Sequence, residues 1–186
     1  NHTWNHVTCN ACRAWEYMPR EILEVEAALA EVGVPKPVSF AWPVGYFGPE
    51  GLQVLEEQGY RIGRRTMFPE SPIINGLPMG VPYDPHRNHP LLIPSTGDAC
   101  FDWTLEHFRR VVDLAKDGRA VVLVFHGVPD WGNPIVSTPR ERFLEYMAYL
   151  KEGGFHVIAM EELLPHMETA PVPDDPMSRR HHPDPD

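Results

Sequence analysis

The alternation of helical and extended patterns is the feature that most limits the fold of this chain. Four times, a helical apolar stripe ends at a glycine and a short apolar run follows it. The predicted helices cover residues 19–32, 49–58, 102–118 and 138–153, and the strands that follow them cover 38–42, 60–64, 120–125 and 155–159. This order of elements predicts an α/β domain.

The third predicted strand, residues 120–125, is apolar at every position. Continuous apolarity predicts burial on both faces, as in a parallel sheet or barrel. Asp102 is placed to cap the helix before this strand, and Thr138 with Pro139 starts a capping box for the next helix. The proline-rich segment 69–94 has no such periodicity, so we expect it to be a functional loop or lid.

The charge balance restricts the partners that the chain can bind. It carries 16 basic and 26 acidic residues, a net charge of −10, which argues against binding to nucleic acid or to an anionic membrane surface. No apolar stretch is long enough to span a membrane. One domain is expected over residues 1–165, because residues 166–186 have the proline-rich, aperiodic composition of a disordered tail.

His2 and His6 are candidate metal ligands. Residues four apart lie on one face of a helical turn, so both imidazoles can face one ion. Zinc needs about four ligands, so the others must come from elsewhere in the fold or from residues outside this chain. The chain starts inside this motif, without an initiator Met or a signal peptide, which predicts that it is part of a longer protein.

Polar residues follow two of the predicted strands, at the edge where parallel α/β folds carry their active sites. One group is the loop 43–46, and the other is His126, whose imidazole suits proton transfer near neutral pH. A purely structural histidine fits the same position. Asp102 is either a helix cap or the carboxylate that orients His126, and Trp103 is either a core residue or an apolar wall.

The cysteines offer a rival metal site. Three cysteines, an odd number, do not indicate a disulfide framework. His6, Cys9 and Cys12, with His2 as a fourth ligand, would form a structural zinc module, although so short a segment makes a cramped cage. A redox Cys-x-x-Cys is disfavoured because no strand precedes it.

Taken in order, these segments resemble the polysaccharide deacetylase family, the NodB-homology domain of metal-dependent carbohydrate deacetylases. The stretch from His2 to His6 is similar to the family's His-Ser/Thr-x-x-His motif, and residues 40–45 look like a divergent Arg-x-Pro-Tyr motif. Asp102 with Trp103 resembles the Asp-Trp motif, and residues 124–126 resemble the terminal Leu-x-His. The resemblance covers most of residues 1–165.

The resemblance implies a distorted (β/α) barrel that lacks its first strands, and hydrolysis of a carbon–nitrogen bond other than a peptide bond. The substrate would be an N-acetylated carbohydrate; an O-acetyl ester or another acylated small molecule stays an alternative. The implied cofactor is a divalent metal ion, zinc first, with cobalt, nickel or manganese as alternatives. His2 and His6 would bind it while a metal-activated water attacks the acyl group.

The same resemblance implies roles for five further residues. His126 would protonate the leaving amine as general acid, and Asp102 would tune it. Trp103 and Val124 would line the pocket for the acetyl methyl group, and a backbone N–H near Val44 would hold the oxyanion.

Two departures from the family pattern leave a second function open. The family's Thr-Phe-Asp-Asp motif, which supplies a metal-binding Asp and the catalytic base, normally precedes the His pair and is not in this chain. Ala41 and Val44 stand where the family has Arg and Tyr, so either another group such as Arg61, Arg64 or Arg65 replaces the arginine, or this subgroup works differently. The alternative is a non-catalytic, carbohydrate-binding domain of the same fold.

Overall fold

The computed structural model describes residues 1–9, 13–70, 73–74 and 77–167. Five α-helices lie within these ranges: α1 (Ala14–Glu31), α2 (Pro49–Glu57), α3 (Leu105–Val112), α4 (Arg140–Glu152) and α5 (Leu164–Met167). The strands found there are β1 (Ser39–Ala41), β2 (Ile62–Arg65), β3 (Ile73–Ile74), β4 (Leu77–Pro78), β5 (Ile93–Pro94), β6 (Gly97–Asp98) and β7 (Leu123–Val124). Four 3₁₀ turns connect them, η1 (Pro43–Gly45), η2 (Pro90–Leu92), η3 (Pro134–Val136) and η4 (Met160–Leu163).

The strands that carry the site are parallel. β1, β2 and β5 form one sheet in that order, and β6 pairs with β7 in a second sheet. The segment 93–98 joins the two sheets, because Ser95 N donates to Arg65 O (3.1 Å) and Thr96 N donates to Val122 O (2.8 Å). Parallel pairing among helices confirms the predicted α/β class, and it brings the carboxyl ends of these strands to one side of the molecule.

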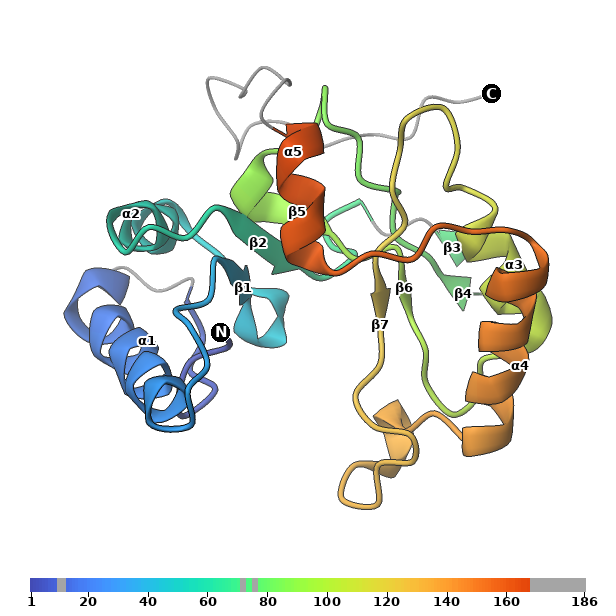
Figure 1. Cartoon of the computed structure of the whole chain (residues 1–186), viewed down its shortest axis with the longest axis horizontal. Helices are drawn as coiled ribbons and strands as arrows, with labels where there is room; N and C mark the ends of the chain where they lie inside the picture. Colours follow the sequence, from blue (N-terminus) through green and yellow to red (C-terminus); the bar gives the residue numbers. More distant parts are fainter. Residues whose placement is uncertain (10–12, 71–72, 75–76, 168–186) are drawn as a thin grey trace.

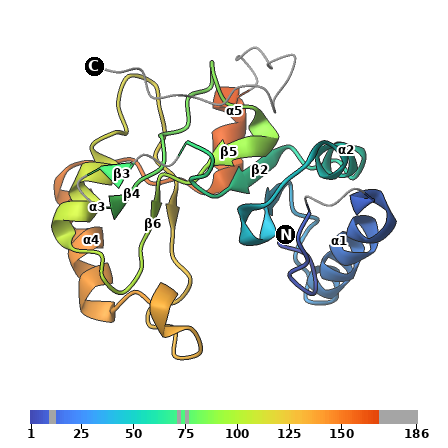
Figure 2. The ribbon, with the colours of Figure 1, turned by 180° about the vertical axis from the view of Figure 1, so that it is seen from behind.

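Helices flank the strands on both sides. Figures 1 and 2 show α1 and α2 beside β1 and β2, and α3 and α4 beyond β6 and β7. One buried cluster fills the α1–α2 side, around Met18, Ile22 and Trp42, and a second fills the α3–α4 side, around Phe108 and Tyr146. No helix in the described part of the chain is long and apolar enough to cross a membrane.

The first predicted helix starts five residues later than the observed one. α1 begins at Ala14, and Pro19 lies inside it instead of in its first turn. The extra turn buries Ala14 and Met18, which are eight and four residues before Ile22 and lie on the same face. Burial of this apolar face offsets the backbone hydrogen bond that a proline inside a helix removes.

Both predicted capping interactions are wrong. Thr104, not Asp102, caps α3: its hydroxyl accepts from His107 N (3.3 Å), and Thr104 N donates to His107 Nδ1 (3.2 Å). The hydroxyl of Thr138 does not cap α4, because it donates to the carbonyl of Ala99 at 2.5 Å. Thr138 therefore ties the start of α4 to the segment that follows β6. α3 also ends at Val112, before the predicted glycine stop.

The strand predictions need three corrections. Within residues 120–125 only Leu123 and Val124 form a strand, and this run is half-buried instead of buried on both faces, because residues 122–125 border a cavity. Residues 155–159 form no strand. The segment 69–94 is not only a loop, since Leu91 and Leu92 are buried and precede β5. Of the predicted tail, residues 166 and 167 end α5, and 168–186 lie outside the described residues.

His89 makes the stability of this core depend on pH. Its ring is buried, and Nδ1 accepts a hydrogen bond from Leu91 N (3.1 Å) at the start of η2. Burial lowers the pKa of His89 below its ordinary value of 6.5. The unfolded chain therefore binds the proton more readily than the folded one, and we expect the free energy of unfolding to decrease as the pH falls below about 6.5.

Urea unfolding of wild type and His89→Asn between pH 7.5 and 5 tests this expectation. Asparagine retains a side-chain acceptor for the cap but does not titrate, so part of the pH dependence should disappear. His86→Asn, three residues away on an exposed turn, is the matched control. Equal slopes for His89→Asn and wild type would contradict the assignment.

Candidate active site

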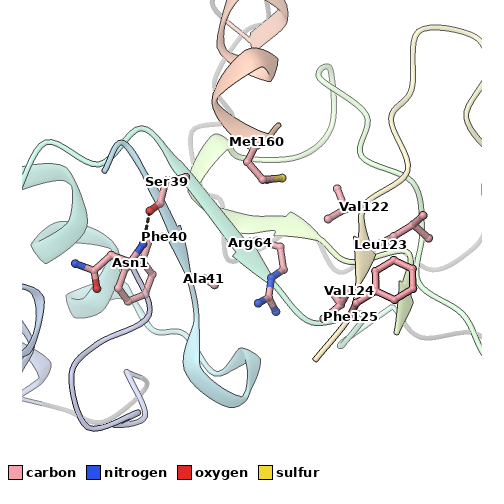
Figure 3. Close-up of a pocket in the computed structure, with 10 residues that line it drawn as sticks. All are labelled: Asn1, Ser39, Phe40, Ala41, Arg64, Val122, Leu123, Val124, Phe125 and Met160. Atoms are coloured by element: carbon pink, nitrogen blue, oxygen red, sulfur yellow. Dashed lines mark hydrogen bonds between the residues drawn. The ribbon is translucent and has the colours of Figure 1, made fainter. Parts of the chain in front are cut away.

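A cavity of about 290 Å³ lies between β1 and β2 on one side and the β7 segment on the other. Its walls are mostly apolar, from Phe40 and Ala41 on β1, residues 122–125 around β7, and Met160. Arg64 on β2 is the one charged side chain that lines it within the described residues, and Figure 3 shows its guanidinium directed between the two walls. Apolar walls with a few polar groups are typical of small-molecule sites.

His2 and His6 lie side by side, but not on a helix. Residues 1–8 have no regular structure, and Thr3 and His6 adopt left-handed backbone conformations, with φ of 61° and 55°. The helical-turn prediction is therefore wrong. The turns still bring the two imidazoles together, with their ring centroids 4.7 Å apart. Asn5 anchors this loop to α1, since its backbone and side-chain nitrogens both donate to the carboxylate of Glu21 (2.7 and 2.9 Å).

His2 is held in the form that can bind a metal. Its Nδ1 lies 2.7 Å from the carbonyl oxygen of Ala41, at the end of β1. A carbonyl only accepts hydrogen bonds, so Nδ1 carries the proton and the lone pair of Nε2 is left for a ligand. Burial lowers the pKa of His2. The hydrogen bond to Ala41 opposes this shift and the charges of His6 and Arg64 add to it, and the net lowering favours the neutral ring.

His126 follows β7, and a carboxylate on the neighbouring strand faces it. Asp98 ends β6, and its Oδ1 lies 3.6 Å from Nε2 of His126. The pairing of Asp98 with Val124 in the β6–β7 register places them there. Oδ1 of Asp98 is buried and accepts no hydrogen bond from the described residues. An ion pair between this carboxylate and a protonated imidazole is the interaction that the geometry allows.

The structure therefore pairs His126 with Asp98, whereas the sequence pointed to Asp102. Asp102 is exposed on the turn before α3, where it raises the pKa of the Cys100 thiol, already raised by burial, to about 11. Asp98 went unnoticed because its strand, Gly97–Asp98, is only two residues long and contains a glycine. The available signal was a carboxylate five residues after the apolar run 91–93.

Of the two side chains predicted to line the pocket, only one does so. Val124 lines the cavity, as expected. Trp103 is buried in the α3–α4 cluster and is not among the lining residues. Its indole packs so closely against Gly97 that a Cβ there would lie 2.3 Å from the ring, and its carbonyl accepts from the hydroxyl of Tyr146 at 2.8 Å. In this position Trp103 supports β6 from behind.

Val44 occupies a strained turn directly after β1. Its φ is 56°, a left-handed conformation that costs a β-branched residue about 1–3 kcal/mol. Neighbouring Gly45 also has a positive φ, 74°, and a Cβ there would meet the Thr66 side chain at 2.1 Å. Close packing on Thr66 therefore holds the turn η1 in place at the edge of the candidate site.

This strain predicts that Val44→Gly stabilises the fold. Glycine adopts the left-handed conformation without steric cost, and its larger backbone entropy in the unfolded chain offsets part of the gain, so we expect a net increase in unfolding free energy of about 1 kcal/mol. Urea unfolding measures it. Val44→Ala removes the branched side chain but keeps a Cβ, so it should be less stable than Val44→Gly. The reverse order would contradict the strained turn.

Of the three arginines that could replace the family arginine, only Arg64 faces the cavity. Its Cα is the register partner of Ala41 on β1. Arg65 points the opposite way into a buried ion pair with Glu70 (2.5 Å), as alternation along a strand requires. Arg61 is exposed and precedes β2.

Cys9 does not fit the rival zinc module. It is fully buried, forms an isolated bridge with Phe47, and its thiol donates to the carbonyl of Val7 (3.4 Å). Burial raises its pKa to about 12, whereas a metal ligand must be a thiolate. Cys12, the other cysteine of that prediction, lies outside the described residues.

The donor chemistry of His2 and His6 suits a divalent ion such as zinc, for which two adjacent neutral imidazoles are common ligands. They fit as part of a coordination shell. No group of three or more His, Cys, Asp or Glu side chains within the described residues is arranged to hold an ion.

Comparison with known proteins supports the family suggested by these residues. A family model described as polysaccharide deacetylase matches residues 1–63, which run from the His pair through β1 into β2. No curated protein and no solved structure matches the chain. The match includes the His pair and the strand to which His2 is hydrogen-bonded, and it supports a polysaccharide deacetylase domain in the N-terminal part of the chain.

Proposed function

We propose that this protein is a metal-dependent hydrolase that removes the acetyl group from an N-acetylated carbohydrate. The observation that carries the proposal is that two pairs of groups lie next to the two walls of one cavity, through Ala41 on one side and Phe125 on the other, although none of the four is among the described lining residues. His2 and His6 lie on the β1 side, and Asp98 and His126 lie on the β7 side. Arg64 lies between the pairs, since its charge acts on both His2 and Asp98.

His2 and His6 are the proposed metal ligands. The hydrogen bond from His2 to Ala41 orients the ring and sets its tautomer, which is how proteins commonly prepare a metal-binding histidine. A divalent ion bound there supplies Lewis-acid activation of water and of the acyl carbonyl. Zinc suits imidazole ligands best, and cobalt, nickel or manganese are the alternatives.

His126 is the proposed general acid. Its Nε2 faces Asp98, so Nδ1 is the ring nitrogen left to deliver a proton to the departing amine. Asp98 Oδ1 lies 3.6 Å from Nε2, where it can orient the ring. Asp98 is thus a positioning residue and takes the role that the family resemblance had given to Asp102.

The apolar wall around Val124 is the proposed place for the acetyl methyl group, because removal of a methyl from water there is favourable. The strained turn at Val44 lies directly after β1, near the hydrogen bond from His2 Nδ1 to the carbonyl of Ala41. Its backbone is the proposed oxyanion donor. Trp103 contributes indirectly, by supporting the strand that carries Asp98.

Metal content and acetate release, measured together on the full-length protein, test this function. N-acetylglucosamine oligomers are the first substrate, and O-acetylated oligomers distinguish amide from ester hydrolysis. Stoichiometric metal with acetate release from the N-acetyl substrate is expected. His2→Ala and His6→Ala should lose both metal and activity, whereas His86→Ala, on an exposed turn, should lose neither.

Bound metal with no acetate released from either substrate would contradict the proposal. Oligomer binding in that protein would instead favour the alternative, a carbohydrate-binding domain without turnover, which Ala41 and the absence of the Thr-Phe-Asp-Asp motif from this chain suggest.

A further inference from the structure

Arg64 is the one charged side chain among the described residues that line the cavity, and the proposed mechanism gives it no role. It lies near the carboxyl end of β2, and its Cα is opposite that of Ala41. In Figure 3 the guanidinium extends into the space between Ala41 and the wall formed by residues 122–125. The small side chain of Ala41 leaves room beside it.

The charge of Arg64 is only partly compensated within the protein. Among the described residues no hydrogen bond joins its guanidinium to an acceptor, and Asp98 is the carboxylate that attracts it. Burial nevertheless outweighs this attraction and lowers the pKa of Arg64. A cation taken out of water without hydrogen-bond partners is costly, so a bound anion would stabilise it.

Its neighbour Arg65 illustrates the difference. The guanidinium of Arg65 donates to three backbone carbonyls, those of Leu92 (3.1 Å), Thr66 (3.1 Å) and Phe68 (2.5 Å), and to Glu70. These hydrogen bonds and the ion pair stabilise the fold. Arg64, with a cavity in place of these acceptors, keeps its donors available for a ligand.

The chemistry of the cavity selects the ligand. A guanidinium pairs best with a planar group that has two oxygens, and it binds carboxylates with two parallel hydrogen bonds. Apolar walls beside it suit a short aliphatic or sugar-borne substituent. The carboxylate of Asp98 and the rings of His2 and His126 lie nearby, so the site is not positive throughout. Mixed charges favour one orientation of a bound carboxylate over others.

We propose that Arg64 is a carboxylate-binding residue that faces the reacting groups of the cavity. The inference rests on the proposed deacetylase function, which creates a carboxylate there. In hydrolysis, the oxygen of water forms a bond to the acyl carbon, the carbon–nitrogen bond breaks, and the amine leaves with a proton, so acetate is released. A carboxylate carried by an acidic sugar is the other source of the same group.

Direct binding of acetate, measured by isothermal titration without substrate, tests the proposal. Arg64→Met keeps most of the side-chain length but removes the charge, and should weaken acetate binding by about tenfold or more. Arg64→Lys retains the charge without the two-pronged geometry and should be intermediate. Arg61→Met, on the same segment but exposed, should bind acetate like wild type. Metal content and thermal melting of each variant report on the metal site and the fold.

A second titration distinguishes the two sources of the carboxylate. N-acetylmuramic acid differs from N-acetylglucosamine by a lactyl group with a carboxylate. If Arg64 binds the released acid, acetate binding depends on Arg64 and the two sugars bind alike. If it binds an acidic sugar, N-acetylmuramic acid binds more tightly than N-acetylglucosamine, and Arg64→Met removes that preference.

Equal affinities of wild type and Arg64→Met for acetate and for both sugars would overturn the proposal. Because binding is measured without turnover, failure of the Arg64 site is distinct from failure of the proposed function. A protein that binds acetate through Arg64 but releases none from its substrates would contradict the deacetylase function alone.

Discussion

Replacing His126 by alanine is expected to lower kcat for acetate release by about 100- to 10,000-fold, the usual contribution of a general acid. Metal content should stay unchanged, because the candidate ligands His2 and His6 lie on the β1 side of the cavity. The side chain of His126 is 43% exposed, so its removal should leave the fold intact. Substrate turnover and metal analysis on the same preparation measure both effects.

A matched pair of carboxylate variants locates the partner of this histidine. Asp98→Asn keeps the shape of the side chain but removes the charge that faces Nε2, and we expect it to lower kcat about tenfold or more. Asp102→Asn, at the exposed position of the Asp-Trp pair, should have a small effect. A larger loss of kcat in Asp102→Asn than in Asp98→Asn would assign the positioning role to Asp102. An unchanged kcat in His126→Ala would contradict the proposal that His126 is the general acid.

Removal of the buried carboxylate of Glu70 is expected to produce the largest loss of stability. Arg65 and Glu70 are 4% and 2% exposed, and they form an ion pair of 2.5 Å in the core that follows β2. Glu70→Ala leaves the guanidinium of Arg65 buried without its counter-charge, and breaking such a pair typically costs about 3–5 kcal/mol. Urea unfolding at neutral pH measures this loss.

The double variant Arg65→Met with Glu70→Met distinguishes the cost of an unpaired charge from a loss of packing. When both charges are replaced by apolar side chains, the penalty for burying them disappears, so the double variant should be much closer to wild type than Glu70→Ala. Glu106→Ala is the surface control, because Glu106 pairs with Arg110 on the exposed face of α3. Equal losses in Glu70→Ala and in the double variant would contradict the electrostatic explanation.

The Arg64 variants and the Arg65–Glu70 variants together distinguish the roles of the two arginines of β2. Arg64 and Arg65 are adjacent in sequence, yet strand alternation sends one side chain into the cavity and the other into the core. Substitution of Arg65 should therefore affect stability, and substitution of Arg64 should affect ligand binding.

Local patterns in the sequence were sufficient for several elements of the fold. Periodicity and glycine at the helix ends predicted the α/β class, the helices α1, α2 and α4, and the strand that ends at Ala41. His126 was placed at the end of a strand, and its strand lines the cavity. The family followed from the motif at His2 and His6, and the match over residues 1–63 bears it out.

What local patterns could not supply was the identity of neighbours that are distant along the chain. Asp98 and not Asp102 faces His126, because the register of β6 with β7 decides which carboxylate reaches the imidazole. A strand of two residues, Gly97 and Asp98, carries too little periodicity to reveal that register.

The sequence by itself determined the residue types available for chemistry and the order of the elements that carry them, because helix and strand preferences act over a few residues. Tertiary structure decided which of those residues meet. Left-handed backbone conformations at Thr3 and His6, not a helix, bring the imidazoles of His2 and His6 together. Burial raises the pKa of the Cys9 thiol and makes it unreactive. The pairing of β1 with β2 places Arg64 opposite Ala41. Each of these depends on contacts between distant segments, and therefore on the free energy of packing the whole domain.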